Sequence, residues 1–258
     1  MDKKYIFFDL DGTLIDHSEN GVSDKTMEAL KLLKANGHDL FIATGRPPSL
    51  FYGIDKELGI DSFIAANGSI AVYKNEVIRD MPIDKDCVNQ IVDFAYKNKI
   101  DIGFESFDDY VVNSRFGENV DKFSDTYHLH YPEIRHNYHL ENNIYQMVLF
   151  YTGNDYKKFE KLFPGLRFNY SNAYGLDINQ KGGLKELGVN AIKEHLNIDI
   201  KDIICVGDGF NDVSMIQYSG LGIAMGNAKD GVKIHADMIA DDISNDGLYK
   251  VLKELKLI

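Results

Sequence analysis

The chain has 258 residues, enough for one large domain or two smaller ones with a sizeable buried core. It carries 28 Lys and Arg against 40 Asp and Glu, a formal net charge of −12, which argues against nucleic acid or an anionic membrane as a partner. The two cysteines, Cys87 and Cys205, are far apart, so we expect neither a disulfide framework nor a zinc site.

No apolar run reaches the ~18 residues of a membrane span. The first residues are charged and lead directly into a predicted strand rather than a signal peptide. We therefore predict a cytoplasmic protein. The sequence does not indicate an oligomeric state.

Strands and helices alternate over residues 1–81 and again from residue 184. In the first part we predict strands over 5–10, 38–43 and 62–66, a helix from Ser23 or Asp24 to Gly37, and a helix from Pro47-Pro48 to about Gly59. In the last part we predict helices over 184–196, up to 219 and from 246, and strands over 203–206, 221–225 and 238–240. This alternation predicts an α/β fold, a doubly wound parallel sheet with helices on both faces.

The pattern between residues 82 and 183 is different. A helix over 84–99, with Val88, Ile91, Val92 and Ala95 as its apolar positions, leads to strands over 100–104 and 110–113. A strand over 144–151 precedes a helix over 156–163 with strands over 166–170 and 174–178. The recurring order of helix, strand, turn and strand suggests a weak internal duplication. We predict a separate α+β domain over 82–183, inserted into a fold built from 1–81 and 184–258.

The first predicted strand ends in two carboxylates, Asp9 and Asp11, followed by Gly12 and Thr13. Asp9 and Asp11 leave an extended backbone on the same side, and two carboxylates that close cannot both ionise cheaply without a cation. Gly12 allows a sharp turn or a close approach to a ligand. Taken alone, the same residues could be a strand end at which aspartates cap a turn.

Two further polar stretches, Thr44-Gly45 and residues 208–212, also follow predicted strands. Ligands of open α/β sheets bind at the carboxyl ends of the strands, so we expect both stretches to lie near the two N-terminal aspartates. Thr44 and Asn211 could instead cap the helices that follow them.

Three stretches in this order resemble the signature motifs of the haloacid dehalogenase (HAD) superfamily: Asp9-Leu10-Asp11-Gly12-Thr13, Thr44-Gly45-Arg46 and Gly207-Asp208-Gly209-Phe210-Asn211-Asp212. The segment between the second and third resembles the large α/β (class IIB) cap of its Cof-type phosphatases. The resemblance spans nearly the whole chain. It implies a HAD-like Rossmannoid core with an inserted cap that closes over the substrate, and a phosphatase that uses Mg²⁺ to hydrolyse small phosphomonoesters, sugar phosphates above all.

The resemblance also implies roles for the four aspartates. Asp9 resembles the nucleophile that forms an aspartyl phosphate, and Asp11 resembles the acid/base that protonates the leaving alcohol and later deprotonates water. Asp208 resembles the carboxylate ligand of Mg²⁺, with Asp212 in support. Asp9 and the backbone carbonyl of Asp11 complete this oxygen-rich metal site, which suits Mg²⁺.

The phosphate group has four candidate partners by the same resemblance. Thr44, the Gly45 N–H and Asn211 match groups that bind phosphate oxygens, and a lysine holds the phosphoryl group and the nucleophile. Relatives place that lysine three residues before a Gly-aliphatic pair, which favours Lys185. Lys181 is the alternative candidate for the lysine that holds the phosphoryl group. Either lysine could instead be a solvated surface residue.

A histidine-rich stretch lies in the middle segment, with His128, His130, His136 and His139. His128 and His130 could share a strand face and bind zinc, but no Asp, Glu or Cys stands at a clear spacing. A polar loop or a substrate-facing surface is therefore the favoured interpretation.

Two functions compete with hydrolysis. A phosphotransferase or phosphomutase of the same superfamily would use the same motifs with an acceptor other than water. A non-enzymatic module that signals through a phosphorylated aspartate would also combine acidic residues, a Thr and a Lys on a parallel sheet. Such a module needs about half this length and neither residues 208–212 nor a cap, so a phosphorylated small molecule is the partner that we predict.

Overall fold

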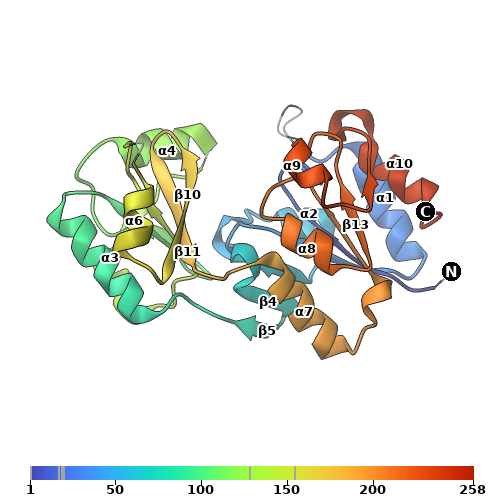
Figure 1. Ribbon diagram of the computed structural model, residues 1–258, viewed down its shortest axis with the longest axis horizontal. Coiled ribbons are helices and arrows are strands. Elements are labelled where there is room, and N and C mark those ends of the chain that lie inside the picture. Colours follow the sequence, from blue (N-terminus) through green and yellow to red (C-terminus); the bar gives the residue numbers. More distant parts are fainter. Residues whose placement is uncertain (1, 17, 19–20, 128, 154) are drawn as a thin grey trace. The chain divides into compact units, whose positions relative to one another are not determined.

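The computed structural model describes residues 2–16, 18, 21–127, 129–153 and 155–258, which form two compact units (Figure 1). The first unit consists of Met1–Gly45, Gly53–Asp80 and Leu184–Ile258, and the second of Arg46–Tyr52 and Met81–Gly183. The segment Arg46–Tyr52 thus groups with the second unit, although the sequence pattern assigned it to the first.

The first unit is built on one sheet of eight described strands, in the order β14-β13-β12-β1-β2-β3-β4-β5. The six strands from β14 to β3 are parallel, and β4 and β5 add an antiparallel hairpin at one edge. Strands β2 to β5, which come before the inserted segment, lie on one side of β1, and β12 to β14, which come after it, lie on the other side. This order confirms the predicted doubly wound α/β fold. The strand bounds are β1 (Tyr5–Phe8), β2 (Asp39–Ala43), β3 (Phe63–Ala65), β4 (Ile70–Tyr73), β5 (Glu76–Asp80), β12 (Ile203–Gly207), β13 (Leu221–Ala224) and β14 (Met238–Ile239).

Helices cover both faces of this sheet. Successive side chains of β1 point to opposite faces, and because these side chains are apolar on both faces, each face is buried under helices. Ile6 and Phe8 pack in one apolar cluster with α1 and α10, and Phe7 packs in another with α7 and α8. Over β4 and β5 lies α7 (Figure 1). The helix bounds are α1 (Asp24–Ala35), α2 (Ile54–Leu58), α7 (Lys185–Leu196), α8 (Val213–Tyr218), α9 (Asp230–Lys233) and α10 (Gly247–Glu254).

The helix predicted from Pro47 to Gly59 is wrong as a continuous element. A 3₁₀ turn over Pro48–Leu50 is followed by a break, and α2 begins at Ile54. Tyr52 and Gly53 cause the break, since both have positive φ, 49° and 86°. Left-handed residues interrupt the helical hydrogen-bond ladder.

The hairpin of β4 and β5 was not predicted. Its turn uses Lys74 and Asn75, both with positive φ, as a two-residue hairpin turn requires. Asn tolerates this conformation well and Lys does not, so the turn signal was weak in the sequence.

The second unit contains a mostly antiparallel sheet of six described strands in the order β10-β11-β9-β6-β7-β8. The hairpins β6–β7 and β10–β11 flank β9, each preceded in the chain by a helix, α3 or α6, in agreement with the repeated pattern. The predicted apolar positions of α3 are buried: Val88, Ile91, Val92 and Ala95. The element bounds are α3 (Lys85–Lys97), β6 (Ile102–Glu105), β7 (Tyr110–Val112), α4 (Asn119–Tyr127), β8 (Glu133–Ile134), α5 (Tyr138–Glu141), β9 (Gln146–Leu149), α6 (Lys157–Leu162), β10 (Leu166–Asn172) and β11 (Gly175–Gln180).

Within the described ranges, no helix combines the length and the apolar character needed to cross a membrane.

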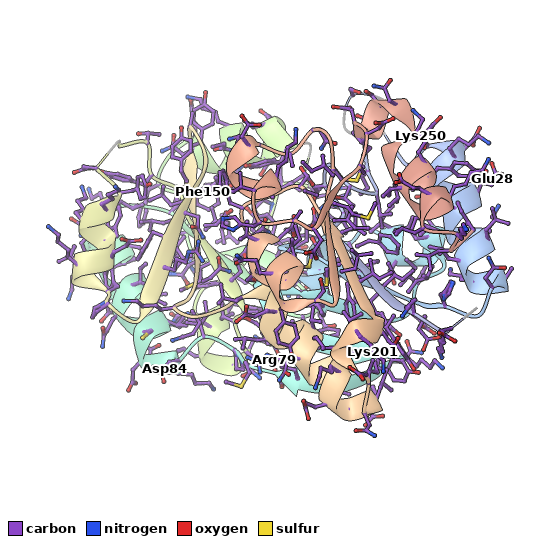
Figure 2. All side chains as sticks on the ribbon, turned by 45° about the vertical axis from the view of Figure 1, so that its right-hand side comes forward. Glu28, Arg79, Asp84, Phe150, Lys201 and Lys250 are labelled. Carbon is purple, nitrogen blue, oxygen red and sulfur yellow. The ribbon has the colours of Figure 1, made fainter. Side chains whose placement is uncertain are left out.

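Gly68 fixes the position at which α7 begins. Its φ is 93°, and a Cβ at this position would lie 2.1 Å from the Leu184 carbonyl oxygen, one residue before the helix. Its own carbonyl accepts a hydrogen bond of 2.7 Å from Nε of Arg79, which Figure 2 labels. Glycine is therefore required here both for its conformation and for the close approach of two backbones.

We predict that Gly68→Ala destabilises the protein much more than Gly37→Ala. Gly37 has a similar φ of 86°, but a Cβ added there would meet nothing within 4 Å, so its substitution tests the conformational cost alone, about 1 kcal/mol. Gly68→Ala adds a backbone collision and should cost about 3 kcal/mol or more. Urea unfolding of both variants measures the difference, and equal costs would contradict the close packing of Gly68 on Leu184.

Candidate active site

Asp9 follows β1 directly and lies at the carboxyl edge of the sheet. Its backbone N–H donates to the Val206 carbonyl at 2.9 Å, which continues the pairing of β1 with β12, and the residue is only 6% exposed. Gly12, three residues on, has a φ of 87°, and a Cβ there would lie 2.4 Å from Oδ2 of Asp208. The turn after β1 therefore requires glycine so that Asp208 can approach the first motif.

Lys185 occupies the centre of the site. It is 0% exposed, and its Nζ donates to Oδ1 of Asp9 at 2.6 Å and to Oδ1 of Asp212 at 2.5 Å. Burial by itself lowers the pKa of Lys185, but Asp212 and Asp9 more than reverse the effect and hold the pKa above its ordinary value. The ammonium group is therefore charged at neutral pH. Lys181, the alternative lysine, is exposed and belongs to the second unit.

Asp212 accepts hydrogen bonds from other residues of the third motif and from Lys185. Its Oδ2 accepts hydrogen bonds from the backbone N–H groups of Asp208 and Gly209, at 3.0 and 2.8 Å, while its Oδ1 accepts from Lys185. Both oxygens of this buried carboxylate are thus engaged by the protein. Asp208 is held from the other side, because the Thr13 hydroxyl donates to its Oδ1 at 3.0 Å.

Three carboxylates converge next to this single lysine. One oxygen each from Asp9, Asp208 and Asp212 all lie within 4.8 Å of one another, and no other such group of His, Cys, Asp and Glu was found in the described part of the chain. Burial, reinforced by Asp212, raises the pKa of Asp9 well above its ordinary value against the opposing effect of Lys185. Burial also raises the pKa of Asp208 to about 6.

Burial is the largest cause of both pKa shifts, and repulsion from Asp212 adds to it. One ammonium faces three carboxylates, and their donor atoms are all oxygens. A hard divalent cation fits this donor set, since Mg²⁺ prefers carboxylate, carbonyl and water oxygens.

The second motif lies at the same edge of the sheet. The Thr44 N–H donates to the Ile64 carbonyl at 2.9 Å, and the Thr44 side chain is buried. A Cβ on Gly45 would lie 3.2 Å from Oδ1 of Asn67 and 3.4 Å from Nδ2 of Asn211, so these two amides surround the Gly45 backbone.

Asn67 is a site residue that the sequence analysis missed. Its Oδ1 accepts a hydrogen bond from Nδ2 of Asn211 at 3.1 Å, and it has a positive φ of 52° just after β3. The signal was present, because Asn67-Gly68 ends a predicted strand of the same parallel sheet. The structure thus brings all eight predicted site residues into the first unit, together with Asn67.

The histidine-rich stretch forms no metal site among the described residues. Nδ1 of His136 contacts the Asn113 carbonyl oxygen at 2.7 Å, and His139 packs against Phe104. His128 lies outside the described residues, and His130 lines a pocket of the second unit.

Comparison with known proteins agrees with the motifs. The sequence matches the family model of haloacid dehalogenase-like hydrolases over residues 6–252. YkrA of Bacillus subtilis (strain 168), provisionally named a phosphatase, is 34% identical over 258 residues, and the match covers 100% of both chains.

Solved structures similar to this chain also cover its whole length or nearly so. A hypothetical protein from Geobacillus kaustophilus HTA426 is 32% identical with a TM-score of 0.95, and 100% of both chains is covered. A HAD subclass IIB sugar phosphatase is 31% identical with a TM-score of 0.85, and the match covers 99% of this chain and 100% of that chain. The resemblance inferred from the three motifs is confirmed: this chain belongs to the haloacid dehalogenase-like hydrolases and is an enzyme of the Cof type.

Proposed function

We propose that this enzyme hydrolyses small phosphomonoesters, with sugar phosphates as the preferred class, through an aspartyl phosphate on Asp9 and with Mg²⁺ as the cofactor. The observation that supports it most is the buried ion pair of Asp9 with Lys185 inside a cluster of carboxylates, at the sheet edge where α/β proteins bind ligands. The phosphatase names of the relatives, YkrA and the subclass IIB sugar phosphatase, support the same reaction.

In the first step an Asp9 carboxylate oxygen attacks phosphorus. The new oxygen–phosphorus bond forms while the bond from phosphorus to the alcohol oxygen breaks, and Asp11 gives its proton to that oxygen. In the second step Asp11 takes a proton from water, whose oxygen attacks phosphorus and releases Asp9 and inorganic phosphate. Covalent capture divides one difficult hydrolysis into two easier displacements.

Asp9 and Asp208, with the backbone carbonyl of Asp11, would hold Mg²⁺, and Asp212 would support them, because its oxygens already accept hydrogen bonds from Lys185 and two backbone N–H groups. When bound, Mg²⁺ would reduce the repulsion between the carboxylates and an incoming phosphate dianion.

The phosphate oxygens would be bound by Lys185, the Thr44 hydroxyl, the Gly45 N–H and Asn211. This local set of donors compensates for a net charge of −12, which by itself repels an anionic substrate. Asn67 would act as a positioning residue, since it hydrogen-bonds Asn211 rather than offering its own Oδ1 to an anion.

We propose two further properties. The inserted segment 82–183 would select the substrate, as in the cap to which its sequence is similar. A cytoplasmic location is in keeping with the two free thiols, Cys87 and Cys205. Phosphotransfer would use the same residues with a different acceptor, and no observation in the structure favours it over hydrolysis.

Asp9→Asn should reduce phosphate release at least about a thousandfold, because the amide keeps the shape of the carboxylate but is not a nucleophile. The assay uses a panel of sugar phosphates and 4-nitrophenyl phosphate, each with and without Mg²⁺. Asp24→Asn, at the exposed start of α1, is the matched control and should behave as wild type. Mg²⁺-dependent release that persists in Asp9→Asn would eliminate Asp9 as the nucleophile.

Mg²⁺ should raise the melting temperature of the wild type, and Asp208→Asn should abolish this effect. A hundredfold excess over Kd adds about 2.7 kcal/mol of stability, which corresponds to several degrees. Protons compete with the metal for Asp208, whose pKa is about 6, so the shift should shrink as the pH falls below that value. Differential scanning fluorimetry at several pH values tests this, and an unchanged response in Asp208→Asn would exclude this carboxylate as a ligand.

Lys185→Met should lower the free energy of unfolding by about 3–5 kcal/mol and remove activity, since Asp9 and Asp212 would remain buried without their cation. Adding Asp212→Asn should restore part of the stability but not the activity. Lys181→Met, the control for the alternative lysine, should change stability by less than about 0.5 kcal/mol. Loss of activity in Lys181→Met but not in Lys185→Met would reverse the assignment.

A further inference from the structure

A side chain outside the three motifs contacts the turn that carries Asp11. Asn227 follows β13, the parallel neighbour of β12, so it lies at the same carboxyl edge of the sheet as Asp9. Its Nδ2 donates a hydrogen bond of 2.8 Å to the backbone carbonyl of Gly12, 215 residues away in the chain. The loop after β13 is thus joined to the first motif.

The two partners of Asn227 determine which way its amide points. Its Nδ2 faces the Gly12 carbonyl, which can only accept, and its Oδ1 accepts a bond of 3.1 Å from the Ile243 N–H, which can only donate. A flipped amide would lose both bonds. Aspartate at this position would keep the bond from Ile243 and lose the bond to Gly12, because a carboxylate has no donor.

The backbone that carries Asn227 is packed closely against the segment before α10. The Gly226 N–H donates to the Asp241 carbonyl at 3.1 Å, and a Cβ on Gly226 would lie 2.4 Å from the backbone N of Asp242. The Met225 N–H donates to the last carbonyl of β12 at 3.0 Å. Asn227 therefore extends from a firmly held loop, as expected for a group that positions another.

Gly12 is the residue of the first motif that most needs such support. Its φ of 87° lies in a region that glycine enters and leaves freely, so its own conformational preference does not hold it there. Its N–H donates to the Ile15 carbonyl at 3.0 Å and shares a peptide plane with the Asp11 carbonyl. Its carbonyl shares the next plane with the Thr13 N–H and accepts from Asn227. One plane is thus held from within the turn and the other by Asn227.

The residues on both sides of Gly12 belong to the candidate active site. Asp11 is the proposed acid/base, and its backbone carbonyl is a proposed ligand of Mg²⁺. The Thr13 hydroxyl donates to Oδ1 of Asp208, another proposed ligand, at 3.0 Å. A rotation of the peptide planes at Gly12 would move these groups together.

We propose that Asn227 is a positioning residue of the active site, which fixes the turn over residues 10–15 and through it Asp11 and Thr13. The inference rests on the proposed function, which assigns these two residues their roles. Asn227 is exposed, so its hydrogen bonds contribute little to global stability, and its loss should act on the turn rather than on the fold.

Asn227→Asp and Asn227→Ala test the proposal, with Asn36→Ala as the matched control. Nδ2 of Asn36 donates to the Leu257 carbonyl, also at 2.8 Å, and Asn36 is likewise exposed, but it lies before β2, at the opposite edge of the sheet. Both Asn227 variants should weaken Mg²⁺ binding about tenfold, measured from melting temperatures at increasing Mg²⁺ concentration. They should also lower kcat for 4-nitrophenyl phosphate about tenfold, with a smaller change in KM. Asn36→Ala should change each quantity by less than about twofold.

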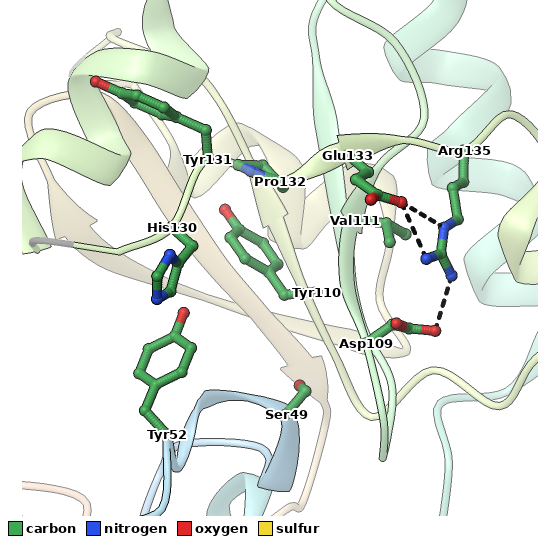
Figure 3. A pocket seen from close by; sticks show the side chains of 10 residues that line it. All are labelled: Ser49, Tyr52, Asp109, Tyr110, Val111, His130, Tyr131, Pro132, Glu133 and Arg135. Carbon is green, nitrogen blue, oxygen red and sulfur yellow. Dashed lines mark hydrogen bonds and ion pairs between the residues drawn. The ribbon is translucent and has the colours of Figure 1, made fainter.

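Arg135→Met is a second control, in the other unit. Arg135 forms ion pairs with Asp109 at 2.9 Å and with Glu133 at 3.0 Å on the wall of a cavity of about 200 Å³, and Figure 3 shows both pairs as dashed lines. This variant should bind Mg²⁺ as the wild type does. Equal weakening of Mg²⁺ binding in Arg135→Met and the Asn227 variants would overturn the proposal, because metal binding would then respond to any lost polar contact.

Amide hydrogen exchange measures the turn itself, without metal or substrate. Both Asn227 variants should exchange faster than the wild type in peptides that cover residues 10–15, and Asn36→Ala should not. Unchanged exchange there, or faster exchange in an enzyme that keeps its Mg²⁺ affinity and kcat, would reduce Asn227 to a structural residue and overturn the proposal. Faster exchange confined to the Asn227 variants of a protein that neither binds Mg²⁺ nor hydrolyses any ester would uphold the support of the turn and reject the proposed function.

Discussion

The structure of the first unit depends on placing one ammonium group, that of Lys185, in a dry environment between two carboxylates. Removing three charges from water is expensive, and only close geometry with further hydrogen bonds compensates for it. That geometry requires β1 and β12 to be neighbours in register, since they deliver Asp9 and residues 208–212 to one edge. It also requires α7 to begin at Lys185, which the contact of Gly68 with Leu184 enforces. The packing of the fold and the electrostatics of the site are therefore one constraint.

The same balance of charges supports the proposal that a cation binds at this site. One lysine cannot neutralise Asp9, Asp208 and Asp212, and burial together with repulsion from Asp212 raises the pKa values of Asp9 and Asp208. A cation lowers these pKa values by favouring the ionised forms. If Asp9 is the nucleophile, as proposed, it must be ionised, and the arrangement that makes the isolated cluster unfavourable would also make its reactivity dependent on a bound metal. Net charge alone would have suggested that this chain repels phosphate.

The sequence predicted those parts of the fold that depend on hydrophobic periodicity and strand order. The alternating pattern identified the parallel sheet, and the spacing in α3 identified its buried face. It failed where backbone conformation depends on tertiary contacts, as in the left-handed Tyr52 that ends the turn before α2 and the Lys74-Asn75 hairpin turn. Asn67 could have been found from the strand-end rule. The burial of Glu105 could not, because glutamate in a short strand normally faces solvent and only the register across three strands shows otherwise.

The site around Lys185 combines full charges, positive and negative, within a few ångströms. Such a site suits a group that is itself charged and passes through a change of charge as it reacts. Glu105 and Tyr110 of the second unit are in a different electrostatic environment, since burial raises the pKa of both and disfavours their charged forms. Burial acts on both sites in the same direction, so the charges around Lys185 persist only because Asp9 and Asp212 have a cation or backbone N–H groups beside them, which Glu105 and Tyr110 do not have.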